Sequence, residues 1–434
     1  MVVQERRRLD TVIGDETGMQ VPAHESAFKS AGVEFLTEAF RNFGSISADN
    51  RVTCIRRIES CPGGSTGKKL FLTVDYLRPE PGLHRELFVK FSRDFDDPVR
   101  DDRGRYEMEG EARFASLSRL HGFPIVVPRV YFSDHQQATN TGLIITERVP
   151  FGMGRIEPHK EKCLDHEIED PFPYYRTIMQ SLARISAMSR SRQYRGMFES
   201  RFPHDPVAMA VQISIPGELD DLQAKIDAFG HFFTQYRHLF PQGMDGSLFE
   251  RIKHAAPSFM AGQRRLANFL QSDPSMIAFC HWNANIDNAW FWRDDDGQLQ
   301  CGLMDWGHAG RMNIAYSLWG CLSGAHFDIW RNGIDELVDV FVTTFNEHDM
   351  VGLDGENVRR HFRIYAALMG LSYFMDAPGR ISARFPDFAN AVDRYDPVFR
   401  AHPTARNQLH ISTVFLEMWR GSDIESDVAH VLSS

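Results

Sequence analysis

The chain has 434 residues, of which 43% are hydrophobic and 24% charged, as in a globular protein with a sizeable core. Its formal net charge of −10 argues against a nucleic-acid partner, because nonspecific binding to DNA or RNA requires a basic surface. The N-terminal residues lack the apolar stretch of a secretory signal, and no run of about twenty apolar residues occurs, so no membrane contact is expected.

The six cysteines include no pair at Cys-x-x-Cys spacing, which argues against a zinc site. Cysteines scattered through a chain of this length are typical of reduced, packed thiols in a cytoplasmic protein. We therefore assign packing roles, and no catalytic role, to Cys280 and Cys301.

The first part of the chain predicts a polar N-terminal arm over residues 1–30. The next hundred or so residues predict three strands, one helix and two further strands, which together form a compact mixed unit. The predicted strands are 51–58, 70–77, 86–91, 126–132 and 142–149, and the predicted amphipathic helix is 106–120.

Helical patterns dominate the chain after Pro150. Their apolar stripes are typical of core-facing helices and need no ligand to explain them. The longest patterns are 174–188, 222–240, 249–271 and 334–348. The aromatic residues of the segment 222–270 fit a core, and part of the segment could also line an apolar acceptor site.

One predicted hairpin interrupts these helices. Apolar runs at 289–292 and 300–304 flank a turn centred on Asp296 and Gly297, and an Asp-Gly pair is a common hairpin turn. Pairing about this turn places Asn288 opposite Asp305. Two oxygen donors at one place are the kind of ligands that Mg²⁺ prefers.

Lys90 lies inside the apolar strand LFVKF, where an unpaired ammonium group would be costly to bury. Its side chain could reach water from an edge strand. It could also pair with a helix glutamate and hold phosphate oxygens. Glu107 and Glu111 lie four residues apart on the following helix, and Glu111 is the favoured partner because it borders the core face.

The Gly-rich segment PGGSTGKK does not fit a P-loop. Pro62 stands at the first glycine position, Lys69 replaces the hydroxyl residue, and a strand follows where a P-loop has a helix. A Gly-rich hairpin can present backbone N–H groups to phosphate, and it can also be only a turn.

Taken in order, these segments resemble the aminoglycoside phosphotransferase and choline kinase family. The segments that carry the resemblance are GGSTGKKLFLTV, LFVKF, EGEARFASLSRLHGFPIVVPRVYF, GLIITERVPFG, YYRTIMQSLARISA, HWNANIDN and MDWGHAG. The resemblance implies an α+β, bilobal protein-kinase-like fold. It implies a small β-rich, nucleotide-binding N-lobe over 31–150 and a larger, mainly helical C-lobe over 151–434 with the catalytic loop, the metal site and the substrate side.

The resemblance also implies ATP and Mg²⁺ as cofactors and a small hydroxylated molecule as the substrate. Lys90 would hold nucleotide phosphates, Glu111 would orient Lys90, and Asn288 and Asp305 would hold Mg²⁺. The other implied nucleotide-binding residues are Gly63, Gly64 and Ser65 of the Gly-rich turn and Glu147 and Val149 of the hinge. His281 is implied to be a structural residue of the loop rather than an acid or base, and His308 to be a polar loop residue.

The catalytic loop departs from the family pattern. Asn283 stands where the family has its catalytic Asp, Trp282 where Gly is usual, and Asn285 where His is common. Ser317 stands where the family usually has an Asp that supports the loop. Asp287 is the nearest carboxylate in sequence, and a rearranged loop could use it as the catalytic group.

The change to Asn283 leaves two hypotheses. An amide cannot take a proton at neutral pH, although its oxygen accepts hydrogen bonds. A positioned base contributes about 10²–10⁴ in rate, whereas phosphoryl transfer depends mainly on positioning and charge stabilisation. The protein is therefore either a slow or impaired ATP- and Mg²⁺-dependent phosphotransferase or a non-catalytic, nucleotide-binding pseudokinase with a regulatory or scaffolding role.

Overall fold

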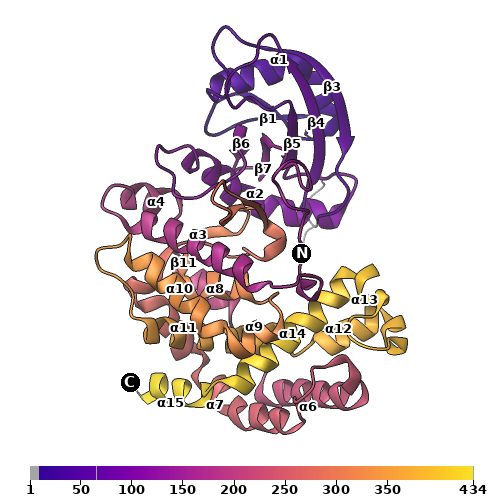
Figure 1. The fold of residues 1–434 in the computed structure, drawn as a ribbon, viewed down its shortest axis with the longest axis vertical. Coiled ribbons are helices and arrows are strands. Elements are labelled where there is room, and N and C mark those ends of the chain that lie inside the picture. Colours follow the sequence, from indigo (N-terminus) through magenta and orange to yellow (C-terminus); the bar gives the residue numbers. More distant parts are fainter. Residues whose placement is uncertain (1–8, 65, 434) are drawn as a thin grey trace. The chain divides into compact units, whose positions relative to one another are not determined.

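The computed structural model describes residues 9–64 and 66–433, which fall into two compact units (Figure 1). The first unit contains the chain up to Met153 together with Gly302–Ala309, and the second contains Gly154–Cys301 and the chain from Gly310 onward. The first is small and β-rich and the second is mainly helical, so the predicted α+β fold is confirmed. Ser65, predicted to bind nucleotide, lies outside the described residues.

The first unit follows the predicted element order from residue 51 to residue 149. Its elements are β1 (Thr11–Ile13), β2 (Gln20–Pro22), α1 (Glu25–Asn42), β3 (Val52–Ser60), β4 (Lys68–Tyr76), β5 (Glu86–Phe91), α2 (Pro98–Leu117), β6 (Val130–Gln136) and β7 (Thr141–Glu147). The strands from β3 onward form a five-stranded antiparallel sheet in the order β3-β4-β5-β7-β6.

The two faces of this sheet are covered by different helices. Side chains alternate between the faces along a strand. Val89 and Phe91 of β5 belong to the hydrophobic core that α1 covers. Lys90 lies on the opposite face beside its strand partner Ile144, which packs against Met108 of α2.

The predicted arm over residues 1–30 is wrong from Leu9 onward, while residues 1–8 lie outside the described part of the chain. β1 and β2 form a small hairpin, and α1 begins at Glu25. Val12 and Val21 enter the hydrophobic core of the first unit. The backbone N–H of Thr17 also donates to Asp134 over 2.9 Å, so a few apolar residues and one buried carboxylate fix this polar segment.

The second unit contains most of the helices. Its elements are α3 (Phe172–Arg190), α4 (Arg195–Arg201), α5 (Pro206–Gln212), α6 (Leu219–Gln235), α7 (Ser247–Ser272), β8 (Ile277–His281), β9 (Ala289–Arg293), β10 (Leu299–Leu303), β11 (Ala309–Asn313), α8 (Ile314–Leu322), α9 (Phe327–Asn332), α10 (Ile334–Asn346), α11 (Gly355–Met369), α12 (Ala377–Arg384), α13 (Pro397–Ala401), α14 (Pro403–Gly421) and α15 (Ile424–Ser433), with the ends of β10 and β11 reaching into the first unit. The long helices predicted from the sequence are confirmed as α3, α6, α7 and α10.

The interior of the second unit is built around α3, which packs against β8, α8 and α10. β8 pairs with β11, and β9 pairs with β10. Phe229, Phe232 and Phe233 of α6 are buried, and Phe229 packs against Phe249 of α7. The aromatic residues of α6 therefore belong to the core, as the first interpretation of segment 222–270 predicted.

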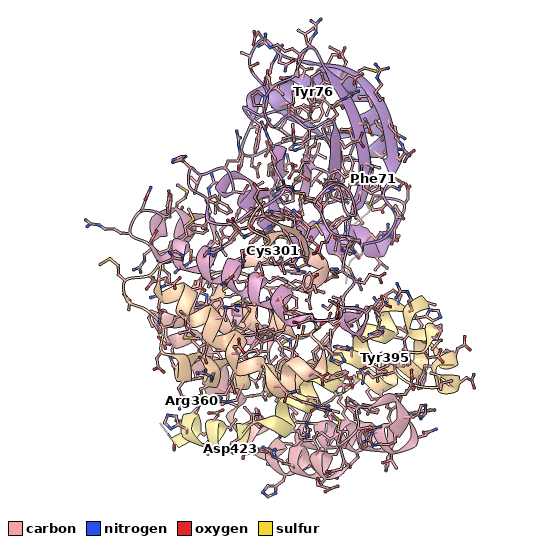
Figure 2. All side chains as sticks on the ribbon, viewed as in Figure 1. Phe71, Tyr76, Cys301, Arg360, Tyr395 and Asp423 are labelled. Carbon is pink, nitrogen blue, oxygen red and sulfur yellow. The ribbon has the colours of Figure 1, made fainter. Side chains whose placement is uncertain are left out.

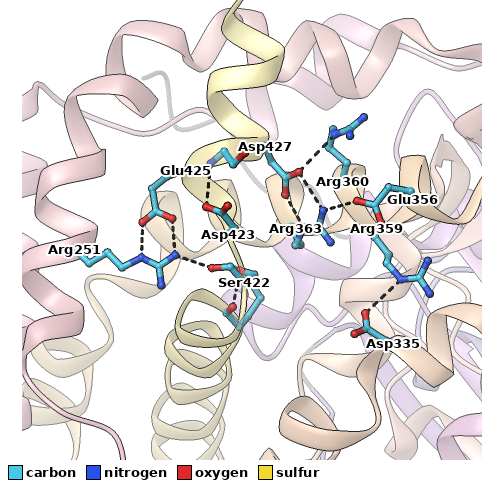
Figure 3. A network of polar contacts seen from close by, with 12 residues as sticks. Arg251, Asp335, Glu356, Arg359, Arg360, Arg363, Ser422, Asp423, Glu425 and Asp427 are labelled. Carbon is cyan, nitrogen blue, oxygen red and sulfur yellow. Dashed lines mark hydrogen bonds and ion pairs between the residues drawn. The ribbon is translucent and has the colours of Figure 1, made fainter.

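Ion pairs join the last helix of the second unit to two earlier ones (Figure 3). Arg251 of α7 binds Glu425 at the start of α15 over 2.5 Å. Arg363 of α11 binds Asp427 of α15, also over 2.5 Å. These pairs are half-buried and linked into a network, which makes them more stabilising than isolated surface pairs.

All six cysteines are free thiols. One of them, Cys301 of the second unit, is labelled in Figure 2. Burial raises the pKa of Cys280 to about 12 and that of Cys301 to about 11. Thiols with such pKa values are poor nucleophiles at neutral pH. The prediction that these two cysteines have packing roles is confirmed. Within the described residues, no helix is both long and apolar enough to cross a bilayer.

Candidate functional site

The first unit contains a buried lysine held between two carboxylates. The Lys90 side chain is 4% exposed, and its Nζ lies 2.6 Å from Oε2 of Glu111 and 2.8 Å from Oδ1 of Asp305. Burial disfavours the ammonium charge, but Asp305 and Glu111 outweigh it and raise the pKa of Lys90. The predicted Lys90–Glu111 ion pair is confirmed, and the reading of Lys90 as an edge residue that reaches water is wrong.

Helix α2 supplies two glutamates, one turn apart, to two different partners. Its N-terminus is capped by the side chain of Asp97, which accepts hydrogen bonds from two backbone N–H groups. Glu111 binds Lys90, whereas Oε1 of Glu107 lies 3.2 Å from Nε2 of His308. The hydrogen bond to Glu107 raises the pKa of His308. His308, expected to be a polar loop residue, therefore helps to hold the segment that carries Asp305.

The segment 302–309 packs tightly against α2. Trp306 stacks on Phe114 with ring centroids 3.8 Å apart, and its indole N–H donates to the Leu303 carbonyl. A Cβ on Gly110 would lie 3.2 Å from the Gly307 carbonyl oxygen, so the small residue permits this approach. These contacts fix Asp305 beside Lys90.

Asp305 has a strained backbone conformation. Its φ is +63°, a left-handed value that is unfavourable for a residue with a side chain. Such strain is often found at functional sites, where the surrounding structure enforces it. The Asp305 side chain is 39% exposed, so a cation from solvent can reach the carboxylate.

The Gly-rich turn leads directly into a strand, which agrees with the rejection of a P-loop. Gly63 and Gly64 have φ values of +89° and +79°, and both are exposed. Left-handed φ values favour glycine, so the two glycines are required for this turn. The backbone N–H groups of Gly63 and Gly64 are the groups of this turn that could donate hydrogen bonds to a phosphate.

The predicted hinge residues lie at the end of β7. Oε2 of Glu147 is 2.9 Å from Nε2 of His84, and the Glu147 backbone N–H donates to the Arg129 carbonyl. The Val149 carbonyl accepts from the N–H of Phe151. The structure thus places both residues where the chain leaves the sheet, and their contact with an adenine stays a prediction.

The loop between β8 and β9, in the second unit, is closed by its own amides. The Asn283 backbone N–H donates to Nδ1 of His281 over 3.3 Å. Asn285 donates from Nδ2 to Oδ1 of Asn283 over 2.8 Å, and Asn288 donates from Nδ2 to the Asn283 carbonyl over 2.7 Å. His281 is fully buried, in agreement with its expected structural role.

Residues that differ from the family pattern also support this loop. The Ser317 hydroxyl donates to the His281 carbonyl over 3.2 Å. The Trp282 indole N–H donates to the Tyr365 hydroxyl over 2.8 Å, and Tyr365 stacks on Tyr316. The substituted positions are therefore built into a packed arrangement of their own.

Gly320 of α8 lies directly beneath this loop. A Cβ at this position would overlap the Trp282 carbonyl oxygen. The requirement for glycine comes from a contact 38 positions away along the chain, and no local pattern in the sequence indicated it.

The charge of Asp287 acts on a buried acid that the sequence analysis missed. The Asp287 carbonyl accepts from Nε2 of His159 over 2.9 Å. Burial, with a contribution from the charge of Asp287, raises the pKa of Asp165 to about 7. Asp165 accepts hydrogen bonds from the Tyr175 hydroxyl and from the His326 backbone N–H. Its position in a charged connecting segment gave no signal of burial.

The β9–β10 hairpin forms as predicted, but its turn is one residue longer. The Asp294 N–H donates to the Gln298 carbonyl, which leaves three residues in the loop. Gly297 takes a φ of +77°, as in a type I turn followed by a bulge. The hydrogen bond that closes the turn joins Asp294 to Gln298, one residue away from the predicted pairing of Asp294 with Leu299, and the position of Asn288 opposite Asp305 stays a prediction.

The chemistry of Asn288 and Asp305 fits a role in holding Mg²⁺. The Nδ2 of Asn288 donates a hydrogen bond to the Asn283 carbonyl, so its Oδ1 is the side-chain atom that could coordinate a cation. Asp305 offers a partly exposed carboxylate. Both atoms are hard oxygen ligands, which suit Mg²⁺ when phosphates and water complete its coordination. The two residues belong to different compact units, and their joint role stays a prediction.

Comparison with known proteins found matches among solved structures. No protein-family model and no curated protein matches the sequence. The chain is similar to a choline/ethanolamine kinase family protein from Mesorhizobium loti, with 14% identity, a TM-score of 0.42, and coverage of 92% of this chain and 99% of that chain. It is also similar to an ethanolamine kinase from Plasmodium vivax, with 12% identity, a TM-score of 0.39, and coverage of 77% and 78%.

A third match is the GDP complex of wild-type aminoglycoside 2′-phosphotransferase-IIIa. Identity is 14%, the TM-score is 0.39, and the alignment covers 90% of this chain and 96% of that chain. These three solved structures are an ethanolamine kinase, a choline/ethanolamine kinase family protein and an aminoglycoside phosphotransferase.

Proposed function

We propose that the protein binds a Mg²⁺–adenine nucleotide and transfers its terminal phosphoryl group, slowly, to a hydroxyl group of a small molecule. The observation that carries this proposal is the buried Lys90 held by Glu111 and Asp305. A core without a ligand gains little from such a group, because apolar residues of similar size are usually at least as stable as a buried ion pair.

Lys90 and the Gly-rich turn would bind the phosphates. Lys90 keeps its charge despite its burial, because Asp305 and Glu111 raise its pKa. Glu111 fixes the direction of the lysine side chain from the rigid helix α2. Gly63 and Gly64 add a turn with exposed backbone, which suits an anion.

Asp305 and Asn288 would hold Mg²⁺, which neutralises charge on the phosphates when it is bound. Asp305 then has two roles, because its carboxylate also binds Lys90. Asn288 is already oriented by its bond to the Asn283 carbonyl.

Asn283 is the reason to expect slow transfer. Its side chain cannot take a proton from an acceptor hydroxyl at neutral pH. Its Oδ1, the atom that could accept a hydrogen bond from that hydroxyl, already accepts one from Asn285. Without a base, a loss of about 10²–10⁴ in rate is expected, and positioning and charge would supply the remaining catalysis.

The same contact favours a second candidate function, that of a nucleotide-binding pseudokinase. The loop amides donate hydrogen bonds to Asn283, and the Trp282 indole is fixed by Tyr365. A loop stabilised in this way can be kept for its shape alone, in a regulatory or scaffolding protein.

Calorimetry with ATP, with and without Mg²⁺, tests the binding that both candidates require. A folded sample that shows no binding at millimolar nucleotide would refute both. Turnover with a panel of small hydroxylated molecules then separates them. Phosphorylated product that accumulates in proportion to enzyme supports the transferase, and binding without product supports the pseudokinase.

A further inference from the structure

A second lysine lies directly beside Lys90. In the antiparallel pair β4–β5, Lys69 is the partner of Lys90, so both side chains project from the same face of the sheet. Two like charges directly opposite each other on neighbouring strands are destabilising. The arrangement therefore calls for a physical explanation.

The two lysines differ in the acidic partners of their ammonium groups. Lys90 contacts two carboxylates. Within residues 9–64 and 66–433, Lys69 has no acidic group within the 4.0 Å that defines an ion pair. Burial, and then the charge of Lys90, lower the pKa of Lys69, while Asp305 and Glu111 oppose this shift from a greater distance.

The Lys69 ammonium lies against the Gly-rich turn. A Cβ added to Gly64 would overlap Nζ of Lys69, so the ammonium group lies directly beside the turn, where the positive φ of Gly64 favours glycine. The turn is exposed, and its backbone N–H groups are the ones that suit an anion. An unpaired cation and an exposed Gly-rich backbone therefore occur at the same place.

The neighbouring Lys68 shows that a lysine on β4 can be accommodated without this strain. Lys68 pairs in register with Phe91 and projects from the face that α1 covers. Its Nζ is 3.8 Å from Glu25, and it is partly exposed. Lys68 and Lys69 thus have the same charge and lie on the same strand, but they project from opposite faces, and only Lys68 has an acidic partner among the described residues.

We propose that Lys69 is a second phosphate-binding lysine, which binds the polyphosphate of the nucleotide together with Lys90 and the Gly63–Gly64 turn. This inference rests on the proposed nucleotide binding. A polyphosphate would provide the anionic partner that Lys69 does not have within the protein. It can bind Lys69 without breaking the ion pair between Lys90 and Asp305. On the sheet face that carries Lys69 and Lys90, Lys69 is thus a cation that can bind an anion without losing another ion pair.

Binding measurements on Lys69→Met and Lys68→Met test this proposal. Each variant removes one lysine charge from β4 and keeps a long side chain, so the two are a matched pair. Affinities for ATP and for inorganic tripolyphosphate are measured by calorimetry. Lys69→Met should weaken both at least about tenfold, which corresponds to one charge-assisted hydrogen bond. Lys68→Met should leave both unchanged, and Lys69→Arg should restore most of the affinity.

The stability of the unliganded protein provides a second readout. Lys69→Met removes a like-charge contact and a partly buried cation that has no ion pair, so it should raise the denaturant midpoint of unfolding. A residue kept only for structure would instead lower the midpoint when replaced. Higher stability with weaker tripolyphosphate binding is the combination that identifies Lys69 as a binding residue.

The outcomes distinguish this proposal from the one on which it rests. If the wild-type protein binds neither ATP nor tripolyphosphate, both proposals are overturned. If it binds ATP, and Lys69→Met loses no more affinity than Lys68→Met, the role of Lys69 is wrong and the proposed function stands.

Discussion

Asn285 donates a hydrogen bond from Nδ2 to Oδ1 of Asn283 over 2.8 Å, so the side chain at the position of the expected base is occupied by its own loop. An aspartate at this position would still accept that bond and would add a group able to take a proton. We predict that Asn283→Asp raises the rate of phosphoryl transfer, or of ATP hydrolysis where no acceptor is known, by about 10²–10⁴.

Asn283→Ala is the control for this prediction. It removes the side-chain oxygen without adding a base, so the rate of phosphoryl transfer or ATP hydrolysis should stay as low as in the wild type. A wild-type rate of about 1–100 s⁻¹ that Asn283→Ala does not change would show that Asn283 is not at the base position. Asp287 would then be the first residue to test.

Asp305→Ala should affect nucleotide binding differently with and without metal. With Mg²⁺ the affinity for ATP should fall, because the variant lacks the carboxylate assigned to the ion. Without metal the affinity should stay the same or rise, because Lys90 loses a competing partner. Calorimetry with and without Mg²⁺ measures both. An equal loss under both conditions would contradict the assignment of Asp305 to the metal.

Glu111→Gln should destabilise the first unit. Removing one partner of a buried ion pair costs about 3–5 kcal/mol when the other charge is left alone, and Asp305 should reduce this cost by continuing to bind Lys90. The measurement is denaturant unfolding. Glu109→Gln is the matched control on the same helix, because its pair with Arg113 is partly exposed and contributes little. Equal effects of the two changes would contradict a special role for Glu111.

Gly320→Ala should destabilise the protein, although alanine is usually the better residue in a helix by about 1 kcal/mol. The new Cβ would overlap the Trp282 carbonyl oxygen, so the loop or α8 has to move. Gly379→Ala in α12 is the control, since nothing lies within 4 Å of its Cβ position. Thermal unfolding should show opposite shifts for the two variants, and a stabilising Gly320→Ala would show that the loop is not held as described.

Asp165→Asn should become more stabilising, relative to the wild type, as the pH rises. Burial raises the pKa of Asp165 to about 7, so the folded state keeps a proton that the unfolded state has released above about pH 4. The stability from the protonated acid is fully present below about pH 4 and is lost as the pH rises through about 7. The difference corresponds to about 1.4 kcal/mol per unit of pKa shift.

Urea unfolding between pH 4 and pH 8 measures this difference. Asp245→Asn is the control, because hydrogen bonds from Ser247 lower the pKa of Asp245, so its contribution changes only below about pH 4 and its difference from wild type should stay constant between pH 4 and pH 8. The low pKa of His361, about 4, affects wild type and variants alike and cancels in the comparison. A pH-independent difference for Asp165→Asn would contradict the assigned pKa.

Local patterns in the sequence determined the order of the elements and one central ion pair. Strands and helices differ in the spacing of apolar residues, and this spacing can be read within a short window. Lys90 inside an apolar strand was expected either to reach water or to pair with a carboxylate, and Glu107 and Glu111 of the following helix were the candidates for pairing. The choice of Glu111 followed from its position at the core face, and the structure confirms it.

Only the tertiary structure decided which residues meet across long stretches of chain. Lys90 and Asp305 are 215 positions apart, and the β9–β10 turn has one residue more than the sequence predicted. The pairing of Lys69 with Lys90, the space required at Gly320 and the burial of Asp165 likewise depend on how strands and helices pack. A sequence shows the periodicity of each element, whereas register and packing depend on contacts between elements, which no single segment records.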